Sequence, residues 1–417
     1  MRKRVTLSGV FIPVFVLLLF MHDYVFLMIE YKFGSTYGLN LWKEIVAILY
    51  LAIMLLTIIY SGKVSRSSFK LLLFLGLLLV FLVVDGAYSE AAFRTLRTLF
   101  TPFVLAVLMA SMLTINFDLR YRILMAALQL VTITFCVFGL YQLFNYSTWS
   151  DFWYVEPLTS MGFELKEYNA IRDGLPRISS FFTSSLEFGF FLVFVFFINF
   201  SRLVFLRSSS RYSGLSTLIR LGWLCIIVYL LFNSTVRSAQ MCWFAGMIYV
   251  VILMLLRQAL LVFLSGLLFV VSMCLATFLF IGLGYTDDPS ALGRLVQWRL
   301  VFDLVMSQPL GLGFSAIGPA QAYWFDSFWL NLATGFGLMS LPIFVIFLFG
   351  YRAIVYRYKD VSVLMGGELK SLYYSLLVLF PIFLYAAFFQ AFYNSTVFYL
   401  FITMVFAAFV GGKNVRN

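Results

Sequence analysis

The sequence is dominated by apolar runs about as long as a lipid bilayer is thick. An α-helix rises about 1.5 Å per residue, so roughly 20 apolar residues cross the ~30 Å hydrocarbon core. This pattern predicts an all-α, polytopic integral membrane protein with about twelve transmembrane helices. The predicted spans are residues 8–29, 42–60, 69–84, 98–115, 122–144, 179–200, 219–233, 239–256, 259–283, 325–350, 371–391 and 396–411.

The composition agrees with a membrane protein. Hydrophobic residues make up 63% of the 417 residues and charged residues only 11%, which is far from the balance of a soluble domain. The first apolar run follows Met1, Arg2, Lys3 and Arg4 and lacks the small-residue cleavage site of a signal peptide. We therefore expect it to remain as the first span of one membrane domain covering residues 1–417.

The four cysteines do not suggest a metal or redox site. All of them lie within apolar runs, and none has the spacing of a zinc or redox motif. We expect no disulfide, no metal and no cofactor. The cysteines are Cys136, Cys225, Cys242 and Cys274.

A net charge of +11 would suit a nucleic-acid-binding protein, but the charges follow the predicted topology instead. With a cytoplasmic amino terminus, the inside segments hold 19 of the 29 basic residues and only Asp118, Asp360 and Glu368 among the 18 acidic ones. This satisfies the positive-inside rule. We expect both termini in the cytoplasm, no nucleic-acid partner, and contact with membrane lipids.

Two outward segments, 145–178 and 284–324, are too long to be simple turns. Functional residues are concentrated on such segments when a rigid scaffold positions them. The stretch Ser290 to Met306 predicts an interfacial helix with Leu295, Trp298, Phe302 and Val305 on one face. Asp288 followed by Pro289 predicts its N-cap and first helical position, rather than a metal pair with Asp287.

Four outward arginines at span ends need an explanation, because an arginine is unfavourable on the translocated side of a membrane. They are Arg177 in "PRISSFF", Arg237 in "NSTVRSAQ", and Arg294 and Arg299 in "GRLVQWR". The planar guanidinium suits a pyrophosphate group in a partly desolvated cleft. The alternative is that each arginine pairs with a nearby carboxylate or lipid headgroup, as Arg299 would with Asp303 one turn away.

The two arginines of the interfacial helix would point about 140° apart. They must therefore bracket a groove, or only one of them is functional. For four other outward cations, Lys32, Lys43, Arg94 and Arg97, a solvated loop or headgroup contact is a sufficient account.

Two carboxylates in the outer half are candidate catalytic groups. Asp326 opens "DSFWLNLATGFGL" and either caps that helix or accepts a proton from a sugar hydroxyl. Glu187 lies in an apolar span, where it either pairs with an arginine or acts catalytically. His22, the only histidine, is remote in sequence from these residues, and we do not expect it to be a base.

The arrangement of motifs over residues 177 to 340 resembles the superfamily of bacterial O-antigen polymerases (Wzy) and O-antigen ligases. The motifs are "PRISSFF", "STVRSAQ", "GRLVQW" followed by the glycine-containing "QPLGLGF", and "DSFWLNLATGFGL". The resemblance implies a fold like that of the GT-C glycosyltransferases, with short interfacial helices in the outward loops. It implies that Arg177, Arg237, Arg294 and Arg299 bind the pyrophosphate of an undecaprenyl-linked oligosaccharide. Ligases of this superfamily usually carry histidine where this chain has Asp326, which favours a polymerase.

The expected function is therefore a metal-independent polymerase at the periplasmic face of a bacterial inner membrane. It would transfer a growing glycan from undecaprenyl pyrophosphate onto the non-reducing-end sugar of a second lipid-linked repeat unit, with Tyr323 and Trp324 stacking on sugars. A chain-length regulator in the same membrane is a further expected partner. The alternatives are an O-antigen ligase acting on lipid A core, and a lipid-linked oligosaccharide flippase or transporter that catalyses no reaction.

Overall fold

The computed structural model is an all-α bundle with one small hairpin. It describes residues 7–36, 38–61, 76, 90–114, 116–145, 152–162, 164–165, 171–172, 174–206, 213–283, 289–313, 316–317, 323, 325–361, 366–392 and 395–414.

The first half of the bundle contains α1 (Leu7–Phe20), α2 (His22–Phe33), a 3-10 turn (Leu39–Leu41), α3 (Trp42–Ser61), α5 (Glu90–Leu113), α6 (Phe117–Asn145), α7 (Val155–Ser160), the antiparallel pair β1 (Ile171–Arg172) and β2 (Leu175–Pro176), and α8 (Ser185–Phe205). The second half contains α9 (Ser213–Asn233), α10 (Arg237–Leu255), α11 (Ala259–Gly282), α12 (Pro289–Ser307), α13 (Phe328–Phe336), a 3-10 turn (Gly337–Met339), α14 (Ser340–Val361), α15 (Gly367–Ala386) and α16 (Thr396–Asn414).

The chain is a multi-pass helical membrane protein. Among the described residues, eight helices are long and apolar enough to cross a bilayer, and nine if the bent pair α1–α2 is one span. The predicted count of twelve stays a prediction. The span expected near 69–84 lies outside the described residues, apart from residue 76, and α5 and α16 contribute shorter apolar stretches, Thr101–Leu113 and Thr396–Gly412.

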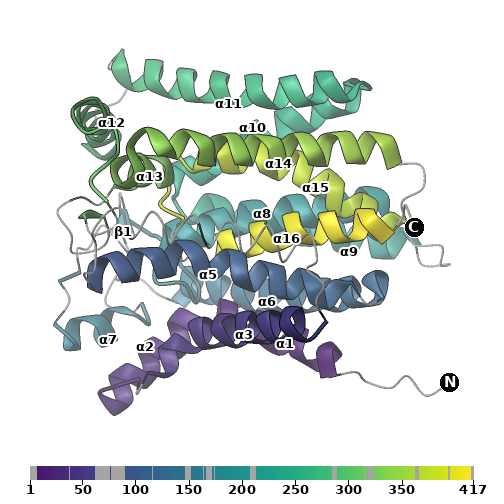
Figure 1. Ribbon diagram of the computed structural model, residues 1–417, viewed down its shortest axis with the longest axis horizontal. Coiled ribbons are helices and arrows are strands. Elements are labelled where there is room, and N and C mark those ends of the chain that lie inside the picture. The colour runs from purple at the N-terminus through teal and green to yellow at the C-terminus, as the bar shows by residue number, and fades with distance from the viewer. Residues whose placement is uncertain are drawn as a thin grey trace.

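The two ends of the bundle differ in structure. Helix α1 begins and α16 ends at one end, which we call the termini end, whereas α7, β1 and α12 lie at the other, which we call the loop end (Figure 1). Helix α12 is seen nearly along its axis there, while α11 and α14 run across the view, so it lies across the end of the bundle (Figure 1). Its first residue is Pro289, as predicted. Its buried face centres on Val301, however, while Phe302 is 62% exposed.

Helices α8, α15 and α16 supply much of the buried core. Almost every residue of α15 is buried, whereas α3, α9 and α11 expose long apolar faces, as expected where lipid covers a helix. The buried helices pack through aromatic rings and a few interhelical hydrogen bonds, such as Tyr249 to Tyr351 at 2.7 Å and Thr277 to Tyr385 at 2.9 Å. Such bonds hold membrane helices together where lipid offers no competing partner.

The predicted first span is not continuous. Helices α1 and α2 meet at Met21 with a bend of 64°. The break falls immediately before His22 and Asp23, the first ionisable residues of this run. A break in a spanning helix frees backbone groups that lipid cannot satisfy, so it requires protein or a polar cavity around it.

The predicted tenth span is one candidate span that changes from α-helix to a 3-10 turn at Gly337–Met339, and this turn anchors the loop that follows α12. Leu312 N donates to Thr334 O, Gly313 N to Gly335 O, and Leu338 N to Pro309 O. This close approach of two backbones needs glycine: a Cβ on Gly337 would lie 2.1 Å from Pro309 O. The glycines at 311 and 313 thus serve close packing within the chain, and Gly318 lies outside the described residues.

We expect Gly337→Ala to destabilise the protein by about 2 to 6 kcal/mol. The new Cβ meets backbone atoms, and the φ of 54° with ψ of −133° is a glycine conformation. Thermal unfolding of the purified protein in detergent measures the change. Gly222→Ala in α9 is the control, because a Cβ there meets no atom within 4 Å. Equal unfolding temperatures for the two variants would contradict this account of the 3-10 turn.

Candidate functional site

Arg177 stands at the loop end, directly after β2. The segment that follows is fixed to α6, because Gln142 Oε1 accepts from Ser179 N at 3.2 Å and Ser180 N at 2.7 Å. The guanidinium interacts with Tyr154 next to α7: burial raises the pKa of the Tyr154 hydroxyl to about 12, and the positive charge of Arg177 opposes that rise. Arg177 therefore lies against the short helix of the first long outward segment.

Arg237 is the first residue of α10 and is exposed. The start of α10 packs beside the start of α8: a Cβ on Gly189 would lie 3.1 Å from Val236 Cβ and 3.2 Å from Ala239 Cβ. A positive charge at a helix N-terminus opposes the helix dipole. The charge of Arg237 therefore does not stabilise α10 through the helix dipole.

Backbone strain marks both of these arginine motifs. Three described non-glycine residues have positive φ, and two of them are Ser180 in "PRISSFF", at 54°, and Thr235 in "STVRSAQ", at 55°. A β-branched residue is rarely found there. Such conformations each require about 1–3 kcal/mol from the surrounding structure and gather at functional sites.

The arginines of α12 have different surroundings. Arg294 is half-buried, with its guanidinium 5.6 Å from the centre of the Phe389 ring and in electrostatic contact with Tyr385. Arg299 is exposed, and no ion pair joins it to Asp303, although the structure describes both residues. Of the two, Arg294 faces the interior of the protein.

Asp326 is exposed, and it does not cap α13. The N-cap is Ser327, whose hydroxyl oxygen accepts from Leu330 N, so the capping alternative is wrong. Asp326 keeps its carboxylate available at the loop end. Tyr323 is half-buried and packs with Phe325 and Val301 in a small apolar cluster, while Trp324 lies outside the described residues.

The connection between α15 and α16 joins several of these groups. Ala387 O accepts from Ser327 Oγ at 3.1 Å and from Phe328 N at 2.9 Å, which holds the start of α13 beside Asp326 in place. Phe389 lies under Arg294. At the far end of the connection, Ser395 and Thr396 bind Glu187. Phe389 and Ser395 lie within seven consecutive residues, at most about 25 Å of extended chain.

Glu187 lies in the first turn of α8, after the N-cap Ser184. Its Oε1 accepts from Ser395 Oγ at 3.0 Å and from Thr396 N at 2.7 Å. Its charged neighbours are Asp23 and Lys43. The cation that interacts with Glu187 is therefore Lys43, and not an arginine as the alternative expected.

Lys43 is 3% exposed, so the solvated or headgroup-bound position expected for it is wrong. Its ammonium is 5.4 Å from the centre of the Tyr399 ring and interacts with Asp23, Glu44 and Glu187. The neighbouring Glu44 binds Arg97 at 3.3 Å. We call these groups the ionic cluster, which comprises Asp23, Lys43, Glu44, Arg97 and Glu187.

Sequence reasoning missed four of the five members of the ionic cluster. A weak signal existed in the sequence: Asp23 is a charged residue inside the first predicted span, and Lys43 and Glu44 open the next one. His22 also borders the cluster, with its Nδ1 accepting from Trp42 Nε1 at 3.0 Å. Charges so placed within membrane helices are functional candidates by default. In the part of the chain that the structure describes, no three His, Cys, Asp or Glu side chains are placed to hold a metal ion.

No family model matches the sequence, and no curated protein matches it significantly. The resemblance to the O-antigen polymerase and ligase superfamily therefore stays a hypothesis.

We expect Lys43→Met to lower the stability of the protein by about 3 to 5 kcal/mol, because it removes a buried positive charge that interacts with the half-buried carboxylates of Asp23 and Glu187. The measurement is thermal unfolding in detergent. Lys32→Met removes the same charge from an exposed position and should leave stability nearly unchanged. If both variants unfold at the wild-type temperature, the ionic cluster does not contribute to stability.

Proposed function

We propose that this protein is a glycosyltransferase that polymerises lipid-linked oligosaccharide repeat units at the loop end of its membrane domain, which we assign to the periplasmic face of a bacterial inner membrane. The observation that carries the proposal is the position of Arg294. Its half-buried guanidinium lies over Phe389 in the α15–α16 connection, which also binds the residues next to Asp326 and the carboxylate of Glu187. A cation and two carboxylates are thus tied to one segment.

The proposed reaction joins two sugars and releases a lipid pyrophosphate. The oxygen of the acceptor hydroxyl forms a bond to the anomeric carbon of the growing glycan, and the bond from that carbon to the pyrophosphate oxygen breaks. The hydroxyl proton passes to a carboxylate. Because the donor is already activated, the protein mainly aligns the reactants and stabilises the negative charge that develops on the leaving group.

The residues divide between these tasks. Arg294 and Arg237, with Arg177 and Arg299 at the edges, bind the pyrophosphate, since guanidinium forks match its oxygens and stay charged at any working pH. Asp326 is the exposed candidate base, and Glu187 is the half-buried one. Tyr323 and Trp324 provide aromatic faces for sugars. This division needs no metal ion.

A polymerase is preferred to a ligase within this proposal. Ligases of the superfamily that the sequence resembles usually carry histidine at the position of Asp326. This chain has aspartate there, and its only histidine, His22, lies beside the ionic cluster, where its Nδ1 accepts from Trp42 Nε1. The acceptor is then a second lipid-linked repeat unit, and the chain grows at its reducing end.

We expect Arg294→Ala and Arg237→Ala each to reduce polymer formation by about 10² to 10³, because each removes a donor to the developing charge. The assay incubates the purified protein in lipid nanodiscs with an undecaprenyl-pyrophosphate-linked repeat unit and resolves the product ladder on a gel. Arg257→Ala, an exposed arginine between α10 and α11 at the termini end, is the control. Full activity of both loop-end variants would refute the pyrophosphate site.

The two carboxylates are distinguished by isosteric amides. If Asp326 is the base, Asp326→Asn lowers kcat by about 10² to 10⁴ with little change in KM. Glu187→Gln keeps an acceptor oxygen for Ser395 and Thr396, so the start of α16 stays in place. A large loss of kcat in Glu187→Gln, with wild-type kcat in Asp326→Asn, would transfer the role to Glu187.

One observation favours a second candidate function, a lipid-linked oligosaccharide transporter. The α1–α2 pair is broken by 64° beside a buried ionic cluster, and transporters use broken helices to form substrate sites. Translocation of the repeat unit across proteoliposome membranes without any ladder would decide for this function.

A further inference from the structure

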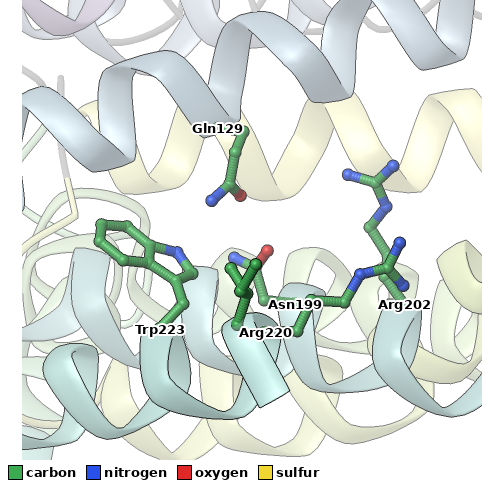
Figure 2. Close-up of a pocket in the computed structure, with 6 residues that line it drawn as sticks. Gln129, Asn199, Arg202, Arg220 and Trp223 are labelled. Atoms are coloured by element: carbon green, nitrogen blue, oxygen red, sulfur yellow. The ribbon is translucent and has the colours of Figure 1, made fainter. Parts of the chain in front are cut away.

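A cavity of about 270 Å³ lies between α6, α8 and α9, on the side of the bundle near the termini end. It is separate from the loop-end site. Gln129 enters it from α6, Asn199 and Arg202 from α8, and Arg220 and Trp223 from α9 (Figure 2). Ile219 completes the lining.

The charge around this cavity is positive. Arg202 and Arg122 both pair with the carboxylate of Glu368, at 3.7 Å and 3.5 Å, so two guanidinium groups share one anion. Arg220 adds a third positive charge and donates to Leu206 O at 3.0 Å, a backbone carbonyl without formal charge. Among the described residues, three arginines thus face one carboxylate, that of Glu368, which leaves a net charge of +2 in this group.

Hydrogen-bond donors at the cavity also lack acceptors. Trp223 Nε1 and Arg202 Nε are both buried and have no hydrogen-bond partner among the described residues. Figure 2 shows the indole of Trp223 and the amide of Gln129 approaching the space from opposite helices. A buried donor left unsatisfied costs about 1–3 kcal/mol. An acceptor-rich anion in the cavity would relieve it.

The apolar surface around the cavity indicates that such an anion would be the headgroup of a lipid. Ile219 in the cavity wall is 65% exposed, and Leu218 beside it and Leu130 on α6 are 66% and 53% exposed. These are lipid-facing surfaces of membrane helices. A single lipid molecule can thus place its anionic headgroup in the cavity and one acyl chain along the apolar face of α9.

We propose that this cavity is a binding site for an anionic phospholipid. The headgroup phosphate accepts hydrogen bonds from Arg202 and Arg220. It also accepts from the indole N–H of Trp223 after a small shift of the side chains that cover this N–H. One acyl chain covers Ile219 and Leu218. A phosphodiester supplies two acceptor oxygens and the negative charge that the guanidinium groups require. This site does not depend on the proposed glycosyltransferase activity.

The test measures lipid binding to the full-length protein in detergent by native mass spectrometry, with palmitoyl-oleoyl phosphatidylglycerol and phosphatidylcholine as probes. We expect preferential binding of phosphatidylglycerol, weakened about fivefold each by Arg202→Gln and Arg220→Gln. Trp223→Phe keeps the ring and removes the donor, and should weaken binding about two- to tenfold. Arg257→Gln removes an exposed arginine at the same end and is the matched control.

Three outcomes would overturn the proposal: equal affinity for the two lipids, equal effects of Arg257→Gln and the cavity variants, or displacement of phosphatidylglycerol by millimolar inorganic phosphate. The last would identify a soluble phosphate site instead. Arg220→Lys guards against misfolding, because lysine keeps the charge and can still donate to Leu206 O. It should retain most of the lipid preference, and a complete loss in this folded variant would also count against the proposal.

Discussion

The hydrogen bonds of the Glu187 carboxylate hold two helices together at the loop end. The carboxylate accepts from the backbone N–H of Thr396 and from Ser395 Oγ, and so joins the start of α8 to the start of α16. A buried carboxylate is expensive unless hydrogen bonds and opposite charge surround it. Lys43 supplies that charge from α3, and Asp23 from the start of α2 adds a second negative group. The half-buried carboxylate of Glu187 therefore joins α8 to α16 by hydrogen bonds and attracts Lys43 on α3.

The two ends of the bundle use basic residues differently. At the termini end they satisfy helix C-terminal carbonyls: Arg220 donates to Leu206 O, Arg357 to Phe409 O and Lys359 to Leu256 O. These contacts place positive charge near helix C-termini, where the helix dipole favours it. At the loop end, Arg237 sits at a helix N-terminus, where its charge is unfavourable, and Arg294 lies over an aromatic ring. These two loop-end arginines are not near helix C-termini, and their proposed role is to bind pyrophosphate.

The glycines after α12 show how a sequence pattern and its structural use can differ. From the sequence, Gly311 and Gly313 were compatible either with close approach of a ligand to the backbone or with a tight turn. The structure uses them for backbone pairing with residues 334 to 338, which holds the 3-10 turn and positions α13. Ser327 at the N-cap then leaves Asp326 exposed. A sequence cannot tell which of two adjacent polar residues will cap a helix, because the choice depends on where the chain enters it.

The sequence by itself determined the helical membrane class, the positions of most long helices, and the helix beginning at Pro289, because these follow from hydropathy, helix length and the fixed φ of proline. It also predicted Arg294, Asp326 and Glu187 as candidate site residues, since charges at apolar span ends are conspicuous, and their roles stay predictions. Only the tertiary structure decided that the first span breaks at Met21, that Lys43 is buried, and that Arg294 rather than Arg299 faces inward. The environment of a charge at a helix end depends on neighbouring helices, and no local pattern of residues specifies those neighbours.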